Sequence, residues 1–212
     1  MRGLVFIGGE GPSPAFGRLL AQNADIIVAA DSGLISAENA GLEPDWVIGD
    51  MDSLDDPGRL EKYPVEKINR FPQDKDYTDT ELALELLWEK GCDEICIAGG
   101  GGGRLDHLLA IRSLFEREKY PQRWVTSAED IRCLDVLDRS GGKLSLGLSE
   151  GSLVSVFPLG IGPWAAESQG LKWHLDGLSW ERGSFGISNR TVEERFAIRV
   201  IQGRFMIIVP LF

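Results

Sequence analysis

The sequence is poor in the residues that cross-link small proteins or hold transition metals. It has three cysteines (Cys92, Cys96 and Cys133) and two histidines (His107 and His174) in 212 residues. The cysteines lie in apolar runs and form no C-x-x-C pair, so we expect buried thiols in a reducing compartment. Two histidines are too few for a histidine-rich zinc site.

Long apolar runs and positive charge are also scarce. No apolar stretch approaches the ~20 residues that cross a bilayer, and the first run, Leu4–Ile7, is too short for a signal peptide. We therefore expect a cytoplasmic protein with no membrane partner. The net charge of −11 argues against a nucleic acid partner, which requires a basic surface. An acidic protein can still bind a nucleotide through a divalent cation held by carboxylates.

Three common motifs are absent. The sequence has no P-loop pattern G-x-x-x-x-G-K-[ST] and no dinucleotide pattern G-x-G-x-x-G with a suitably placed acid. It also has no G-x-S-x-G around a serine. These absences disfavour the two standard nucleotide folds and a serine hydrolase.

Residues 1–138 alternate between short apolar runs and helical patterns. Alternation of this kind predicts an α/β domain with a doubly wound, mostly parallel sheet. Strands are predicted at 4–7, 26–30, 46–48, 94–98, 124–126 and 131–137, and helices from Ser13 and at 34–40, 80–90 and 106–118.

Residues 139–212 have a different pattern, with glycine- and serine-rich turns between short apolar runs. We expect a small all-β sandwich or barrel with strands at 143–146, 153–157, 196–200 and 205–209. A domain of roughly 70 residues is near the lower limit for independent folding, so it would gain stability by forming a dimer.

Acidic residues follow the predicted strands. Asp50 and Asp52 come directly after the third strand, and Asp79 ends an acidic turn before the helix at Thr80. Ligands bind beyond the carboxyl ends of parallel strands, and two nearby carboxylates suit Mg²⁺. Two alternatives stay open: Asp50 and Asp52 form a solvated turn, or Asp79 is only a helix cap.

Five consecutive glycines, residues 99–103, lead into the next helix with Arg104, Asp106 and His107. A glycine-rich loop before a helix presents N–H groups to phosphate, and Arg104 can add a bidentate contact. The alternatives are a flexible turn for the glycines and a structural role for His107.

Six segments together resemble the thiamine pyrophosphokinase family. They are A-D-S-G (30–33), P-D-W-V-I-G-D-M-D-S (44–53), D-K-D-Y-T-D-T-E-L-A-L (74–84), G-G-G-G-R-L-D-H (100–107), G-L-K-W-H-L (170–175) and I-S-N (187–189). The resemblance implies a homodimer with an α/β ATP-binding catalytic domain (1–138) and a β-sandwich domain for thiamine binding and dimerisation (139–212). It implies transfer of pyrophosphate from Mg²⁺-bound ATP to the thiamine hydroxyl, with release of AMP.

The resemblance also implies roles for individual residues. Asp50, Asp52 and Asp79 are similar to the Mg²⁺ ligands and, with Arg104 and Asp106, to the catalytic set; the proton acceptor is Asp79 or Asp106. Ser188 and Asn189 are similar to the thiamine-side motif, whereas Arg190 stands where many relatives carry an acid. The implied nucleotide contacts are Asp31, Ser32, Gly33, Lys75, Asp76, Thr78, Gly101, Gly102, Gly103 and His107.

Other functions remain as alternatives. They are pyrophosphate transfer to another hydroxymethyl heterocycle such as a pterin, nucleotide or thiamine binding without turnover, and simple ATP hydrolysis. A binding module would be expected to lack part of the carboxylate set, but all four candidate aspartates are present in the sequence. ATP hydrolysis alone would leave the second domain without a purpose.

Overall fold

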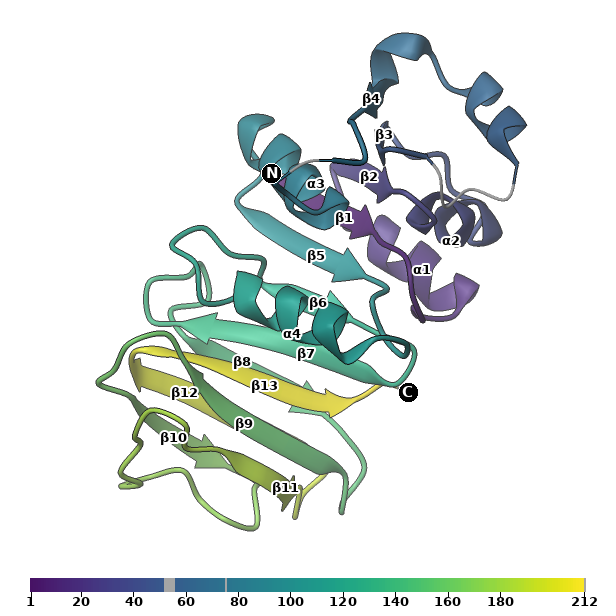
Figure 1. Cartoon of the computed structure of the whole chain (residues 1–212). Helices are drawn as coiled ribbons and strands as arrows, with labels where there is room; N and C mark the ends of the chain where they lie inside the picture. The colour runs from purple at the N-terminus through teal and green to yellow at the C-terminus, as the bar shows by residue number, and fades with distance from the viewer. Residues whose placement is uncertain (52–55, 75, 212) are drawn as a thin grey trace. The chain divides into compact units, whose positions relative to one another are not determined.

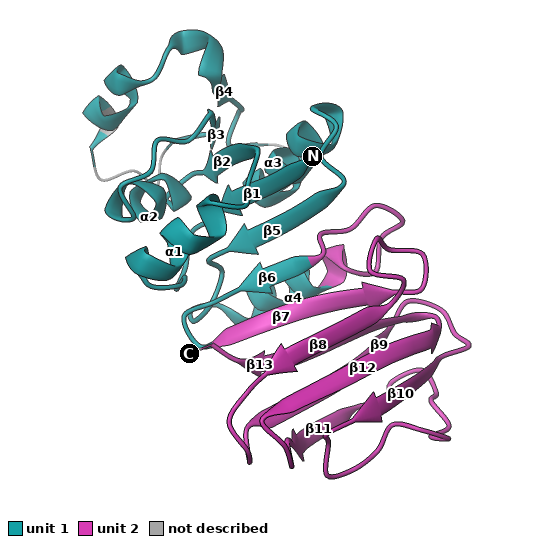
Figure 2. Cartoon of the chain, turned by 180° about the vertical axis from the view of Figure 1, so that it is seen from behind, with its two compact units in different colours: residues 1–112, 123–128 teal, residues 113–122, 129–212 magenta. Residues whose placement is uncertain are grey.

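The computed structural model describes residues 1–51, 56–74 and 76–211 (Figure 1). The chain forms two compact units (Figure 2). Unit 1 comprises residues 1–112 and 123–128, and unit 2 comprises residues 113–122 and the chain from residue 129 onward. Asp52, Ser53 and Lys75 of the predicted site segments lie outside the described residues.

A six-stranded parallel sheet forms the centre of unit 1, in the order β6-β5-β1-β2-β3-β4. Val5, Val28 and Ile97 on three neighbouring strands are fully buried, as expected where helices cover both faces of a parallel sheet. The strands are β1 (Arg2–Phe6), β2 (Ile26–Ala30), β3 (Trp46–Gly49), β4 (Ile68–Arg70), β5 (Glu94–Ala98) and β6 (Arg123–Val125).

The direction of winding reverses between β1 and β5. The chain moves from β1 to β2 and β3, and later from β4 to β5 and β6 in the opposite direction. Right-handed crossovers therefore place α1 and α2 on one face and α3 on the other, as Figure 1 shows. The helices are α1 (Pro14–Ala21), α2 (Gly33–Asn39), α3 (Asp79–Glu89) and α4 (Leu105–Leu114), with short 3₁₀ helices at Pro57–Lys62 and Val65–Lys67.

Two helix starts show how local sequence determines the boundaries. Ser13 caps α1, its hydroxyl accepting a hydrogen bond from the Phe16 N–H, and Pro14 is the first helical residue, as predicted. Helix α3 begins at Asp79, one residue before the predicted start at Thr80. Thr78 is its cap, so the open alternative of an Asp79 cap does not hold. Thr78 and Glu81 form a reciprocal capping box, so Asp79 is the first helical residue.

The fourth helix is shorter than the prediction of 106–118. It ends at Leu114, and the Arg204 guanidinium donates hydrogen bonds to the carbonyls of Phe115 (2.9 Å) and Arg117 (2.8 Å). These bonds satisfy carbonyls that a longer helix would have used internally.

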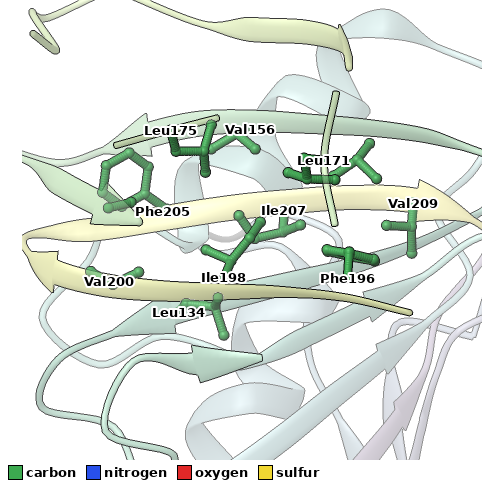
Figure 3. Close-up of a cluster of buried hydrophobic side chains, with 12 residues drawn as sticks. Leu134, Val156, Leu171, Leu175, Phe196, Ile198, Val200, Phe205, Ile207 and Val209 are labelled. Carbon is green, nitrogen blue, oxygen red and sulfur yellow. The ribbon is translucent and has the colours of Figure 1, made fainter. Parts of the chain in front are cut away.

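Unit 2 is a β-sandwich of two antiparallel sheets, in the orders β11-β9-β13-β7 and β10-β12-β8. Alternate residues of β12 and β13, such as Phe196 and Ile198 or Phe205 and Ile207, bury their side chains in one core (Figure 3). The strands are β7 (Glu129–Asp135), β8 (Lys143–Gly147), β9 (Leu153–Leu159), β10 (Ala165–Gln169), β11 (Gly186–Arg190), β12 (Arg195–Gln202) and β13 (Arg204–Pro210).

The predicted fold class, an α/β domain followed by a small β-sandwich, is confirmed. Both β7 and β8 belong to unit 2, so the predicted boundary after residue 138 falls inside this unit. The division into a catalytic domain (1–138) and a thiamine-binding domain (139–212) stays a prediction. Strands β4, β10 and β11 were missed, because β4 has three residues and the others carry polar or small residues that mask alternation.

Two further expectations concern cysteines and membranes. All three cysteines are free; Cys92 and Cys133 are buried, and Cys96 is half-buried. Within the described ranges, no helix combines the length and the apolar character that a bilayer crossing requires.

The packing of α2 on β1 requires glycine at position 33. A Cβ on Gly33 would lie 2.1 Å from the Phe6 carbonyl oxygen, and that oxygen belongs to the backbone of a buried strand. We expect Gly33→Ala to lower the free energy of unfolding by about 3 kcal/mol, the upper range for overpacking. A Cβ on Gly147 would meet nothing closer than 3.7 Å, so Gly147→Ala is the matched control. Equal urea midpoints for the two variants would contradict this account.

Candidate active site

The carboxyl ends of the parallel strands bring the predicted nucleotide-binding loops to one edge of unit 1. Asp31 follows β2, Asp50 follows β3, and the glycine-rich loop 99–103 follows β5. The strand order reverses between the neighbouring strands β1 and β5, and the loops that follow these two strands leave the sheet at this same edge. Such a position is the usual ligand crevice of an open parallel sheet.

Three carboxylates gather at this edge: Asp31, Asp50 and Asp79. The Asp31 carboxyl is within hydrogen-bonding reach of the Asp79 carboxyl and within electrostatic range of Asp50. Burial, followed by the hydrogen bond and charge of Asp79 and then the charge of Asp50, raises the pKa of Asp31 from 3.8 to about 7. The backbone N–H of Met51 opposes this shift by donating to Asp31.

The position of the Asp31 side chain depends on Gly49. A Cβ at residue 49 would lie 1.8 Å from Oδ1 of Asp31, and the φ angle of Gly49 is +145°. The Asp31 N–H donates to the Ile48 carbonyl at 2.9 Å, so the backbones of β2 and β3 hold the carboxylate over the glycine. Only a residue without a side chain permits this contact.

The donor chemistry of this edge fits a hard divalent cation. Oδ1 of Asp31 is buried with no hydrogen-bond partner among the described residues, and a cation would relieve the repulsion that raises the pKa of this group. The described residues contain no cluster of three or more His, Cys, Asp or Glu side chains arranged around one ion. Asp52, the second residue of the predicted metal pair, lies outside the described residues. Any ion here would therefore need further oxygen ligands.

Backbone strain coincides with the predicted sites. The non-glycine residues of the described ranges with positive φ are Asp31 (47°), Met51 (66°) and Ser188 (61°). Asp31 and Ser188 are predicted site residues, and Met51 lies between Asp50 and Asp52. Such conformations cost energy and cluster at functional sites.

The glycine-rich loop is held by its first three residues. The N–H groups of Gly99, Gly100 and Gly101 donate to the carbonyls of Val125, Gly8 and Glu10 at 2.8–2.9 Å. Gly101 therefore cannot offer its N–H to a phosphate, although the prediction included it. The N–H groups of Gly102 and Gly103 form no hydrogen bond within the described part of the chain, and both residues have positive φ. These two remain the candidate phosphate donors of the loop.

Arg104 and Asp106 form an exposed ion pair at the start of α4. Nε and Nη2 of Arg104 lie 3.1 and 2.5 Å from the two Asp106 oxygens, and Asp106 also accepts from the His107 N–H. The pair with Arg104 lowers the pKa of Asp106 below its usual range. Among the described residues, no contact joins Asp106 to the three carboxylates, so the predicted fourth member is not brought together with them.

The remaining predicted nucleotide contacts have mixed environments. Ser32 and Gly33 start α2 beside β1, where a Cβ on Gly8 would lie 2.5 Å from the Ser32 hydroxyl. Asp76 and His107 are exposed. Thr78 is engaged with Glu81 as the cap of α3, which fixes the position of Asp79.

The predicted thiamine motif lies on β11, where the strand contains a bulge. The pairing partners Gly186–Val156 and Asn189–Val154 leave one extra residue on β11. Ser188 is exposed at the bulge, whereas Asn189 is 6% exposed. The Asn189 amide bonds the backbone N–H and C=O of Trp173 at 3.1 and 2.7 Å. Asn189 therefore orders the segment that presents the half-exposed Trp173 ring, and its polar atoms are occupied within the protein.

Arg190, the departure from the family pattern, donates to the Gly151 carbonyl at 3.0 Å. The sequence prediction did not include two residues that follow β1 and β6, Glu10 and Ser127, whose side chains are hydrogen-bonded to each other. The available signal was the segment Gly8-Gly9-Glu10 at the end of the first strand.

Two family models match the chain. The model for "Thiamin pyrophosphokinase, catalytic domain" matches residues 18–124, and the model for "Thiamin pyrophosphokinase, vitamin B1 binding domain" matches residues 142–203. The chain is also 37% identical to thiamine pyrophosphokinase of Bacillus subtilis over 84 residues. That alignment covers 39% of this chain and 39% of the relative.

Solved structures share the fold over the whole chain. The crystal structure of thiamine pyrophosphokinase from Bacillus subtilis has a TM-score of 0.79 at 23% identity, with all of both chains covered. A family protein from Enterococcus faecalis has a TM-score of 0.75 at 23% identity, also with full coverage. Thiamin pyrophosphokinase from Candida albicans has a TM-score of 0.73 at 18% identity, covering all of this chain and 89% of the other.

The Asp31 carboxyl gives a pH-dependent contribution to stability. Its pKa is higher in the folded state (about 7) than the ordinary 3.8, so the folded state binds the proton more tightly than the unfolded chain. The free energy of unfolding therefore falls as the pH rises from about 4 to about 7. We expect Asp31→Asn to flatten this part of the profile, measured by urea unfolding without divalent cations. The exposed Glu89→Gln is the control, and an unchanged slope in Asp31→Asn would refute the prediction.

Proposed function

The chain belongs to the thiamin pyrophosphokinase family, and we propose that it transfers the pyrophosphoryl group of ATP to the hydroxyl of thiamine, giving thiamine diphosphate and AMP. The observation that carries this proposal is the meeting of Asp31, Asp50 and Asp79 at the edge that also holds the glycine-rich loop. This edge offers ligands for a cation beside donors for phosphate.

A bound magnesium ion would neutralise the phosphate oxygens of ATP and favour attack on the β-phosphorus. Asp50, Asp52 and Asp79 are the residues that would hold it. The carboxylates of the acidic edge support this assignment, because they would repel a bare triphosphate.

The chain itself supplies positioning and charge. The free N–H groups of Gly102 and Gly103, at the entry to α4, would bind phosphate oxygens together with the positive end of the helix dipole. The Arg104 guanidinium is 74% exposed and oriented by Asp106, so it can reach a phosphate of the bound nucleotide.

The environments of the carboxylates distinguish the two proton acceptors left open by the sequence. Asp106 is paired with Arg104, which lowers its pKa and makes it a weak base. Asp79 lies at the acidic edge with Asp31 and Asp50. We therefore favour Asp79 over Asp106 as acceptor of the thiamine hydroxyl proton.

In unit 2, the exposed Ser188 at the bulge of β11 is the proposed thiamine contact. The burial and hydrogen bonds of Asn189 support a positioning role for this residue. The Arg190 guanidinium donates to the Gly151 carbonyl and keeps its positive charge, so Arg190 is not assigned a thiamine contact.

The assay that tests the activity supplies MgCl₂, ATP and thiamine and measures both products. We expect AMP and thiamine diphosphate in equal amounts, no turnover in excess chelator, and at least a 100-fold lower kcat in Asp50→Asn, about the effect of removing a group that stabilises transition-state charge. The exposed Glu89→Gln should match the wild type.

The same assay separates the alternatives. A product from hydroxymethylpterin in preference to thiamine would favour the pterin enzyme. ADP or free phosphate without a thiamine product would indicate hydrolysis. Binding of both ligands without AMP release would indicate a non-catalytic module, and undiminished activity in chelator would refute the metal requirement.

We also propose that the protein is a cytoplasmic homodimer that associates through unit 2. The apolar side chains of Phe185 and Ile187 are 60% and 56% exposed on and beside β11, the edge strand of its sheet. Exposed apolar side chains at an edge strand are a favourable surface for a second copy.

Light scattering coupled to size exclusion tests this assembly. We expect a dimer mass for the wild type and at least tenfold weaker association for Ile187→Asp, because an unpaired charge would be buried in the interface. Ile161→Asp changes a 96% exposed residue in the loop between β9 and β10 and should keep the wild-type mass. A monomeric wild type, or equal masses for both variants, would overturn the proposed interface.

A further inference from the structure

Glu10 is fixed at the point where the winding of the sheet reverses. Its N–H donates to the Gly101 carbonyl at 2.7 Å, and its carbonyl accepts from the Gly101 N–H at 2.9 Å. The neighbouring Gly8 carbonyl accepts from Gly100 at 2.8 Å. The loops after β1 and β5 are therefore joined by three backbone hydrogen bonds, and Glu10 has a defined position at the usual ligand crevice.

The Glu10 side chain turns toward β6. Its Oε2 accepts a hydrogen bond from the Ser127 hydroxyl at 3.0 Å, and both residues are exposed. The carboxylate also lies against the glycine-rich loop, since a Cβ on Gly102 would be 2.7 Å from Oε1. An exposed acceptor group thus lies directly beside a candidate phosphate donor.

The order of groups along the edge gives this carboxylate a place in the nucleotide site. Asp31 and Asp50 follow β2 and β3, whereas Glu10 extends to the opposite side of β1, toward β5 and β6. A triphosphate that runs from the aspartates to the glycine-rich loop would leave its nucleoside on the Glu10 side. This step rests on the proposed function.

The chemistry of a carboxylate indicates which part of the nucleoside Glu10 would contact. It accepts hydrogen bonds and repels phosphate, so its partner must be a donor close to the phosphates. The ribose hydroxyls meet this condition, whereas the adenine amino group lies at the far end of the base. An acidic residue near the end of a parallel strand has this role in dinucleotide-binding folds.

We propose that Glu10, oriented by Ser127, accepts hydrogen bonds from the ribose hydroxyls of the nucleotide and makes the enzyme selective for ribonucleotides. Glu10 is then a specificity-determining residue that the motifs of the sequence did not include. Ser127 acts through Glu10 as a positioning residue.

The test compares ATP, 2′-deoxyATP and 3′-deoxyATP at saturating thiamine and MgCl₂. For wild type, we expect kcat/KM to fall about 10–100-fold for at least one deoxynucleotide, the effect of losing a hydrogen bond to a charged group. Glu10→Ala should lose a similar factor with ATP and should use the deoxynucleotide as well as ATP. Glu10→Gln should keep part of the preference, Ser127→Ala should weaken it, and Glu89→Ala should leave it unchanged.

A structural role for Glu10 predicts a different pattern. If Glu10→Ala or Glu10→Gln lowers kcat/KM by the same factor for all three nucleotides, or keeps the full wild-type preference, the proposal is overturned. The backbone pair with Gly101 does not need the side chain, so circular dichroism and thermal unfolding should match the wild type.

Binding measured without turnover separates this inference from the proposed function. Calorimetry with AMP, 2′-deoxyAMP and 3′-deoxyAMP should show the same discrimination in wild type and its loss in Glu10→Ala. If that pattern appears but no thiamine diphosphate forms, the ribose contact stands and the proposed function fails. If thiamine diphosphate forms but wild type binds all three monophosphates equally, the ribose contact fails alone.

Discussion

The contact between the Asp31 carboxylate and the Cα of Gly49 determines the arrangement of the acidic edge. Asp31 follows β2 and Gly49 ends β3, and the Asp31 N–H is bonded to the Ile48 carbonyl. Because residue 49 has no Cβ, the carboxylate can lie across the neighbouring strand and reach Asp79 at the start of α3. A side chain at residue 49 would displace Asp31 and separate the two acids.

Gathering these acids costs stability, which the rest of unit 1 must offset. The repulsion and burial appear as the raised pKa of Asp31, and the positive φ values of Asp31 and Met51 add backbone strain. The buried strands and the capping box of α3 nevertheless hold the three carboxylates together against this repulsion and strain. A site that is unfavourable without a cation binds one more strongly, because binding removes the repulsion.

The sequence predicts the fold well where patterns are local. Ser13-Pro14 specifies the start of α1, and the apolar run at 26–30 coincides with β2. It predicts the site less well, because the decisive contacts are between distant residues. No local pattern indicates that Asp31 meets Asp79, because the two residues are far apart in the sequence. Thr78 was assigned to the nucleotide although the spacing Thr78-x-x-Glu81 is itself a local signal for the capping box that forms.

The thiamine motif on β11 shows a similar limit and its physical reason. The bulge inserts one residue, so Ile187 and Ser188 are both exposed and Asn189 turns inward to the Trp173 backbone. Regular alternation would have placed Ile187 and Asn189 on one face. Because the bulge breaks this period, the sequence of β11 does not show the alternation of a strand. Asn189, predicted as a thiamine contact, instead bonds the Trp173 backbone. The same irregularity leaves Ser188, in its strained conformation, as the polar group of this motif that a ligand can reach.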